Sequence, residues 1–241
     1  MSLLKTFEIY CAGKFITTPE ILAVTNPYDG SEVADTFMAG EPELNMAIDA
    51  AGKVAYEMAN LPSYIRYNIL KQISEEIFAQ RQEFATLITL ESGKPIRYSL
   101  AEIDRSIQTF IVAAEESKRL PAEYFSIDWT PAGAGKEGLV KYFPVGIVAG
   151  IAPFNFPLNL AVHKIAPAIA SGCPIILKPS STTPLSTLML SQIIDKTVLP
   201  KGAVSILPMN REQTGYRRSH QFAFIYRFTR SGMENETRVR E

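Results

Sequence analysis

Three apolar, strand-like runs alternate with two helical stretches in the second half of this chain, and this alternation constrains the fold more than any other feature. The runs are residues 146–151, 174–177 and 203–207, and the helical stretches between them are residues 158–171 and 185–196. The first run is continuously apolar, which is typical of a strand covered on both faces. Strand, helix, strand, helix, strand at these spacings predicts a parallel sheet with right-handed crossovers. We therefore expect an α/β fold that contains part of a Rossmann-like sheet.

Upstream of this region, the chain alternates first like strands and then like helices. Short strands and turns are expected in the first forty residues, with a turn at Asn26–Ser31 that contains Pro and Asp-Gly. Apolar residues then recur at helical spacing on two successive faces, which are Leu44, Ala47, Ile48, Ala51, Val54, Ala55 and Met58, and Ile65, Ile69, Ile73 and Ile77. Gly93 is placed to cap a helix and Pro95 to stop it, and a further helix is expected over residues 97–118.

Composition excludes several classes of protein. The formal net charge of the 241 residues is −1 and no basic stripe with interleaved aromatic residues is present, so no nucleic acid partner is expected. No apolar run reaches the roughly 18 to 20 residues that span a bilayer, and the first residues have no signal-peptide core, so we expect a cytoplasmic protein without a membrane partner. Cys11 and Cys173 are too few and too far apart for a disulfide framework or a metal site.

Five short motifs occur together in this chain. They are Asn26–Gly30, Glu91–Pro95, Val145–Val148, Ala152–Leu158 and Leu177–Ser181. In their order and approximate spacing they resemble the NAD(P)-dependent aldehyde dehydrogenases, over residues up to about Gly215. The resemblance implies an oxidoreductase that oxidises a small aldehyde to the acid with NAD or NADP, and a homo-oligomeric protein. No Gly-x-Gly-x-x-Gly is present, so this expectation rests on the motifs and not on a dinucleotide fingerprint.

The resemblance assigns Asn155 to the binding of an oxyanion. Attack on an aldehyde turns the carbonyl oxygen into an oxyanion, and a preorganised donor aimed at that oxygen is worth roughly 3 to 4 kcal/mol. An asparagine amide suits this role because it donates without carrying a charge. Pro153 and Pro157 would fix the turn and start the following helix. An isolated Asn in such a turn would be an ordinary structural residue, but the accompanying motifs favour the functional interpretation.

The same resemblance assigns five residues to the cofactor, which are Ile151, Pro153, Phe154, Lys178 and Ser181. Lys178 follows an apolar strand, at the strand end where ligands bind in open α/β sheets, and is expected to hydrogen-bond the adenosine ribose. Ser181 stands where many NAD-preferring members have a glutamate for the ribose hydroxyls. A neutral hydroxyl leaves room for a 2′-phosphate, so we expect that NADP is tolerated.

The sequence does not supply the family's nucleophile. Cys11 and Cys173 each have a context typical of a packed structural thiol, and neither resembles the catalytic cysteine of the family. His163 lies between apolar residues of a helix and is expected to be a core or edge histidine. The general-base glutamate of the family belongs to the half that is not matched. We therefore expect this chain to be an inactive fragment.

The composition changes sharply near residue 216. Residues 216–241 contain six Arg and no Lys, without a clear periodicity. Allowed codons for Ile225–Glu236, read one nucleotide forward, give Phe-Thr-Gly-Ser-Pro-Glu-Val-Gly-Trp-Lys-Met, which resembles the family's Gly-Ser turn near the cofactor pyrophosphate. A basic tail is the alternative. We interpret the change as a frameshift or truncation and expect a poorly ordered tail.

These observations divide the chain into four segments. Residues 1–136 are expected to give strands and helices to the cofactor domain, residues 137–145 a strand of an oligomerisation-type arm, residues 146–215 the βαβαβ part of the cofactor domain, and residues 216–241 an unrelated tail. Two non-catalytic alternatives remain: a nucleotide-binding module, or a fragment that binds other subunits through unpaired sheet edges.

Overall fold

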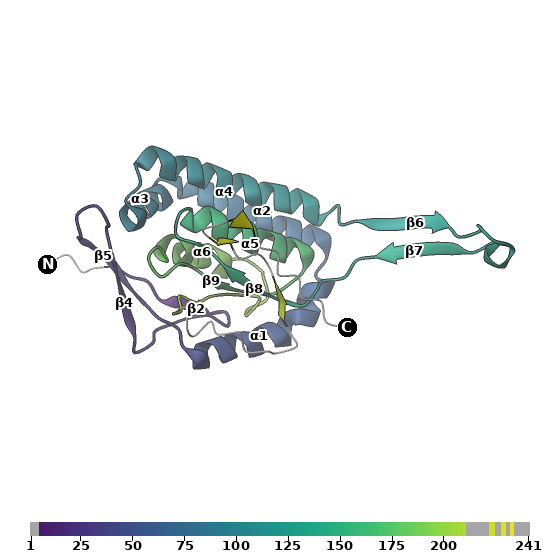
Figure 1. Ribbon diagram of the computed structural model, residues 1–241, viewed down its shortest axis with the longest axis horizontal. Coiled ribbons are helices and arrows are strands. Elements are labelled where there is room, and N and C mark those ends of the chain that lie inside the picture. Colours follow the sequence, from purple (N-terminus) through teal and green to yellow (C-terminus); the bar gives the residue numbers. More distant parts are fainter. Residues whose placement is uncertain (1–4, 211–221, 225–227, 230–231, 234–241) are drawn as a thin grey trace.

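A six-stranded sheet lies at the centre of the computed structural model, which describes residues 5–210, 222–224, 228–229 and 232–233. The strand order is β11-β8-β9-β10-β2-β3 (Figure 1). The strands are β11 (Phe222–Phe224), β8 (Ile147–Ile151), β9 (Ile175–Lys178), β10 (Val204–Ile206), β2 (Ile9–Cys11) and β3 (Lys14–Ile16). The first four are parallel, whereas β2 pairs antiparallel with β10 and with β3. The predicted α/β fold is confirmed, and an N-terminal hairpin makes the sheet mixed.

Helices α5 (Pro157–Ser171) and α6 (Leu185–Asp195) connect β8 to β9 and β9 to β10. The strand–helix–strand–helix–strand alternation therefore appears where the sequence predicts it. Gly172 ends α5 in the left-handed region at φ 79°, and a Cβ there would lie 2.8 Å from the carbonyl oxygen of Met58. Only glycine meets both requirements without strain.

Alternate residues of the central strands face two different hydrophobic cores. Ile175 and Leu177 pack into the larger core with Val148, whereas Ile147 and Ile176 pack into the smaller one. This alternation is the two-residue period of a strand that is covered on both faces. Helix α1 (Glu41–Asn60) covers the face of the smaller core through Ala47 and Ala51. The remaining helices lie on the other face (Figure 1).

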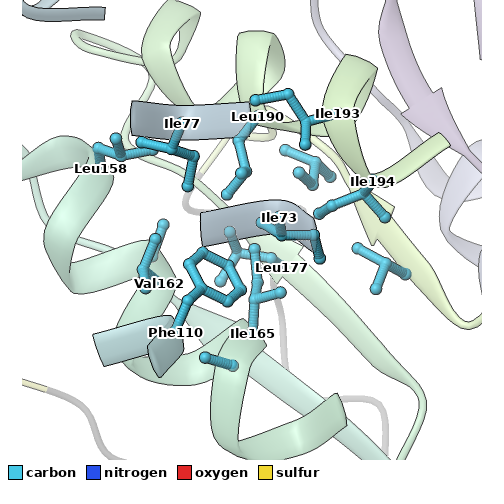
Figure 2. Packing of buried hydrophobic residues seen from close by; sticks show 14 of the residues in the cluster. Ile73, Ile77, Phe110, Leu158, Val162, Ile165, Leu177, Leu190, Ile193 and Ile194 are labelled. Atoms are coloured by element: carbon cyan, nitrogen blue, oxygen red, sulfur yellow. The ribbon is translucent and has the colours of Figure 1, made fainter. Parts of the chain in front are cut away.

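The larger core joins three layers, which are the sheet, the pair α5 and α6, and an outer layer of α2, α3 and α4. The outer helices span Ser63–Ala79, Arg81–Ser92 and Ile96–Ser117. Figure 2 shows Ile73 and Ile77 of α2 and Phe110 of α4 packed among side chains of α5, α6 and β9. Of the face predicted from the spacing, Ile69, Ile73 and Ile77 are buried and Ile65 is half-buried. Gly93 caps α3 at φ 68°, and its N–H donates to the Thr89 carbonyl at 2.9 Å, as predicted.

A second sheet, in the order β1-β5-β4, forms beside the main one. Its strands are β1 (Lys5–Thr6), β4 (Ile21–Thr25) and β5 (Glu32–Phe37). The predicted turn joins β4 to β5: the Gly30 N–H donates to the Asn26 carbonyl, and the Tyr28 N–H donates to Asn26 Oδ1. Within the described residues, no helix is both long and apolar enough to cross a membrane.

An antiparallel hairpin of β6 (Ala122–Ser126) and β7 (Glu137–Lys141) extends away from the body as an arm (Figure 1). The strand expected within residues 137–145 is therefore the shorter β7, and its partner β6 is an element that the sequence did not reveal. A 3-10 turn at Pro131–Gly133 lies between the strands. The rings of Phe125 and Trp129 stack with their centroids 5.9 Å apart.

The segment after residue 215 contains short strands that were not expected. β11 pairs in parallel with β8, with Phe222 opposite Ile147, and β12 (Phe228–Thr229) pairs with β13 (Gly232–Met233). The unpaired edge of β8 gives the Phe-Ala-Phe sequence of β11 a template for pairing, which the local sequence pattern could not show. The rest of residues 216–241, including most of the range used for the frameshift interpretation, lies outside the described residues.

A buried glutamate holds α6 against the outer helices. Glu91 of α3 is 2% exposed, and its two carboxylate oxygens accept from the Leu185 N–H at 2.7 Å, the Ser186 N–H at 3.2 Å and the Ser186 hydroxyl at 2.5 Å. These N–H groups belong to the first turn of α6, where no backbone acceptor is available within the helix. The carboxylate satisfies both donors and complements the helix dipole.

Glu91 should make stability depend on pH. Burial raises the pKa of Glu91 from an ordinary value of 4.5 to about 7, against the effect of the hydrogen bonds from Ser186 and Leu185 and together with the nearby charge of Glu102. A raised pKa adds stability that is complete below the unfolded pKa and is lost as the pH rises to the folded one. The free energy of unfolding of the wild type, relative to E91Q, should therefore fall by on the order of 3 kcal/mol between pH 4.5 and 7.

Urea-induced unfolding of both proteins across this pH range measures the difference. E83Q, on the exposed side of the same helix, is the matched control and should follow the wild type. A difference in the free energy of unfolding between the wild type and E91Q that stays constant with pH would contradict the prediction.

Candidate functional site

The candidate site lies where the parallel strands end. Ile151 is the last residue of β8 and Lys178 the last of β9, and the two are register partners. The Ala152 N–H donates to the Lys178 carbonyl at 2.9 Å, which continues the pairing one residue beyond the strand. The carboxyl ends of parallel strands form the edge at which ligands bind in open α/β sheets. Two of the residues assigned to the cofactor are thus adjacent at this edge.

The loop between β8 and α5 carries three further assigned residues. Pro153 is half-buried, while Phe154 is 62% exposed and Asn155 is also exposed. Ile151, at the start of this loop, is 45% exposed although it is apolar. An apolar surface of this kind, next to an exposed amide, can contact the flat face of a ligand while the amide donates to a ligand oxygen.

The loop between β9 and α6 carries Ser181, which is half-buried. It belongs to a tight turn in which the Thr183 N–H donates to the Ser180 carbonyl at 3.3 Å and the hydroxyls of Ser180 and Thr182 lie 2.8 Å apart. Lys178 enters this loop from β9, and its Nζ donates to the Pro179 carbonyl at 3.5 Å. Lys178 at the end of β9 and Ser181 in the loop that follows are therefore close together in sequence, next to the loop that carries Asn155.

Two residues that the sequence did not assign hold the Asn155 turn. Lys94 Nζ lies 2.7 Å from Glu102 Oε2 and donates to the Asn155 carbonyl at 2.8 Å. The other carboxylate oxygen of Glu102 accepts from the Leu158 N–H at 3.0 Å and from the Asn159 N–H at 3.1 Å. Glu102 thus accepts from the first-turn N–H groups of α5, as Glu91 does from those of α6.

The backbone donors at the start of both helices are therefore occupied. A helix N-terminus usually attracts phosphate because its first N–H groups are unpaired and its dipole is positive. Here a buried carboxylate accepts from Leu158 and Asn159 of α5, and another from Leu185 and Ser186 of α6. These four N–H groups are therefore not available to the phosphates of a nucleotide.

Two cations lie over the ring of Phe156, the residue between Asn155 and the start of α5. Lys94 Nζ is 4.8 Å and the Arg105 guanidinium carbon 4.9 Å from the ring centroid. Both distances are within the range of cation–π attraction. Phe156 thereby connects the turn to α4 as well as to the α3–α4 connection.

A sequence signal for Glu102 does exist. It lies in the buried stripe of α4 that contains Ile103, Ser106 and Phe110, where an acidic residue needs a partner. Lys164 is comparable: it is 4% exposed on α5, donates to the Leu160 carbonyl at 3.0 Å, and burial lowers its pKa. A charged residue at an apolar position of a helix pattern is therefore the sequence signal that could have indicated the role of Glu102.

Neither cysteine is close to Asn155. Cys173 is buried beyond the C-terminal end of α5, whereas Asn155 precedes its N-terminus, and a helix of 15 residues is about 22 Å long. Cys11 is buried in β2, where its thiol donates to the Glu43 carbonyl and burial raises its pKa to about 11. His163 is exposed on α5. Within the described residues, no three His, Cys, Asp or Glu side chains gather as a metal site would require.

The sequence profile of the Aldehyde dehydrogenase family matches residues 16–221. The 3-sulfolactaldehyde dehydrogenase of Priestia aryabhattai is 34% identical over 211 residues, a match that covers 88% of this chain and 44% of the relative. The chain thus spans less than half the length of this relative.

Two solved structures have the same fold. Aldehyde dehydrogenase 21 from Physcomitrella patens, in complex with the reaction product succinate, is 44% identical with a TM-score of 0.85, over 87% of this chain and 44% of that one. An NAD+ complex of aldehyde dehydrogenase from Bacillus cereus is 25% identical with a TM-score of 0.80, over 86% and 42%. Since the profile matches most of the residues and the fold agrees, the chain belongs to the aldehyde dehydrogenase family.

Proposed function

We propose that this protein serves the oxidation of an aldehyde to its acid with NAD or NADP. The observation that carries the proposal is the position of Asn155, whose exposed amide lies in an anchored turn beside the Ile151–Lys178 pair. Because Lys94 anchors the Asn155 carbonyl, the backbone that carries the amide is restrained, which favours a preorganised donor. It would stabilise the negative oxygen that forms when the aldehyde carbon is attacked.

The edge around Lys178 fits the cofactor. NAD or NADP, when bound, supplies the acceptor for a hydride. Lys178 would donate to ribose hydroxyls, and Ile151, Pro153 and Phe154 would provide the apolar contacts. Ser181 is neutral and half-buried in the loop that follows Lys178, so a 2′-phosphate would meet no carboxylate there.

We also propose that the 241-residue chain has no turnover by itself. Its two cysteines are buried and neither adjoins Asn155. A raised pKa further reduces the thiolate fraction of Cys11. The chain would keep the oxyanion donor and a weak nucleotide site, without a nucleophile.

A second proposal concerns the arm formed by β6 and β7: we propose that it contacts another copy of the chain. The arm and the two residues that follow it have five exposed large apolar residues, which are Tyr124, Trp129, Leu139, Tyr142 and Phe143. A two-stranded hairpin is only marginally stable in water by itself, and exposed aromatic residues are common at protein interfaces. Both observations support an arm that is covered in an oligomer.

Substitution of Lys178 should weaken nucleotide binding. Because K178M removes a charged donor, the dissociation constants of NAD+ and NADP+ should rise roughly tenfold in calorimetric titrations. K196M, at the far end of α6, is the matched control and should bind like the wild type. Equal affinity of K178M and the wild type would refute the role of Lys178, and strong exclusion of NADP+ by the wild type would refute the role of Ser181.

The purified chain should not oxidise aldehydes. We expect no aldehyde-dependent formation of NADH or NADPH, measured by absorbance, with 3-sulfolactaldehyde or with the semialdehyde of succinate. The physical reason is the absence of an accessible thiol near Asn155. Sustained turnover would contradict the proposal that the chain has no nucleophile. If C11S or C173S abolished that turnover, the substituted cysteine would be the nucleophile, and if neither did, the nucleophile would be another residue.

Charge placed on the arm should disrupt association. The double variant L139K/F143K changes two exposed residues, which are 61% and 79% exposed, so the fold of the monomer should persist. Sedimentation should show an oligomeric wild type and a monomeric variant. V198K, at another exposed apolar residue, should associate like the wild type. A monomeric wild type at high micromolar concentration would rule out the arm as a self-association site.

A further inference from the structure

We propose that Lys94 and Glu102 are positioning residues that fix the orientation of the Asn155 amide. The inference rests on the proposed function of Asn155 as an oxyanion donor. Its basis is a partly buried network that contacts the turn on both sides of Phe156 and connects it to α4 and to the α3–α4 connection. Neither side chain needs to touch the substrate for this role.

Lys94 acts on the first side of the turn. Its ammonium donates to the Asn155 carbonyl at 2.8 Å, so it holds the backbone of the residue whose side chain is in question. The Lys94 side chain is only 16% exposed and lies between Gly93, which has φ 68°, and Pro95. Gly93 permits the left-handed turn that ends α3, and Pro95 restricts the backbone of Lys94, the residue before it, so the approach of Lys94 to the turn is limited by its own backbone.

Glu102 acts on the second side. Its Oε1 accepts from Leu158 and Asn159, while its Oε2 is paired with Lys94 at 2.7 Å. The Glu102 side chain, which is 0% exposed, thus fixes the position of the first turn of α5 relative to the Lys94 ammonium, which in turn contacts Asn155. The turn cannot rotate about Phe156 without breaking at least one of these charged contacts.

The energetics favour a positioning role over simple stabilisation. Removing a lysine and a glutamate from water costs much of what their attraction returns, and apolar residues of similar size often stabilise a core equally well. A pair in which the carboxylate is buried and the ammonium is half-buried, with three backbone contacts, in contrast favours a single geometry. Preorganised geometry is what a donor to a developing oxyanion needs.

The test compares variants of the 241-residue chain by nuclear magnetic resonance. K94M removes the contact to Asn155, and E102Q removes the charge while keeping one acceptor. K94R retains a cation that can reach both partners. D104N is the matched control, because Asp104 is on the same helix and pairs with Arg81 at 2.6 Å on the exposed surface. The readouts are the Asn155 side-chain amide resonance, assigned with N155A, and hydrogen exchange of the Leu158 and Asn159 amides.

A positioning pair predicts a specific pattern. In K94M and E102Q the Asn155 side-chain resonance should shift, and the Leu158 and Asn159 amides should exchange at least about tenfold faster than in the wild type. K94R should restore the wild-type pattern, and D104N should not change it. Exchange that stays at the wild-type rate, or that rises equally in all amides along with a lower thermal midpoint, would overturn the proposal because the pair would then be only structural.

Two further results keep the outcomes distinct. If E102Q does not fold, K94M and K94R decide the question, because the carboxylate that caps α5 remains in both. Titration of the same samples with NAD+ tests the proposed function separately. A wild type whose resonances around Lys178 do not respond to NAD+ would contradict the nucleotide proposal, while the exchange data would still decide whether Lys94 and Glu102 hold the turn.

Discussion

The rest of this structure depends on the satisfaction of helix N-termini by buried carboxylates. α5 and α6 both start at the carboxyl edge of the sheet, inside the larger core, where water cannot accept from their first N–H groups. Glu102 and Glu91 supply the acceptors from the outer helix layer. The positions of the two loops that carry the candidate site residues therefore depend on contacts with α4 and α3 as well as on the sheet.

This arrangement differs from the usual one at the carboxyl edge of a nucleotide-binding sheet, and the chain has no glycine-rich fingerprint. In the usual arrangement the first helix after a strand receives the pyrophosphate, and glycine allows the close approach. Here the corresponding donors face protein carboxylates. The edge retains an ammonium, hydroxyls and exposed apolar side chains, which are the groups that the proposed cofactor role uses. Charge compensation for phosphates would have to come from other parts of the protein.

Most of the fold could be predicted, because the period of the apolar residues is strong where elements are buried. Ile69, Ile73 and Ile77 marked α2, and the run 146–151 marked β8. The arm strand β6 was missed because its residues are mostly exposed, so they show no buried face. β11 was missed because its pairing depends on the edge of β8. In the site, motif resemblance located Asn155 and Lys178, whereas the Lys94–Glu102 pair needed three-dimensional contacts: 61 residues separate Lys94 from Asn155.

The N-terminal hairpin has a consequence for how the site can be enlarged. β2 and β3 occupy the side of β10, and the Tyr10 hydroxyl donates to Asp195 at the end of α6, which fastens the hairpin in place. A strand joining the sheet beyond β3 would be separated from the Ile151–Lys178 pair by several strands. A strand joining beyond β11 would instead lie close to β8. A strand added to this sheet could therefore approach the candidate site from the β11 side and not from the β3 side.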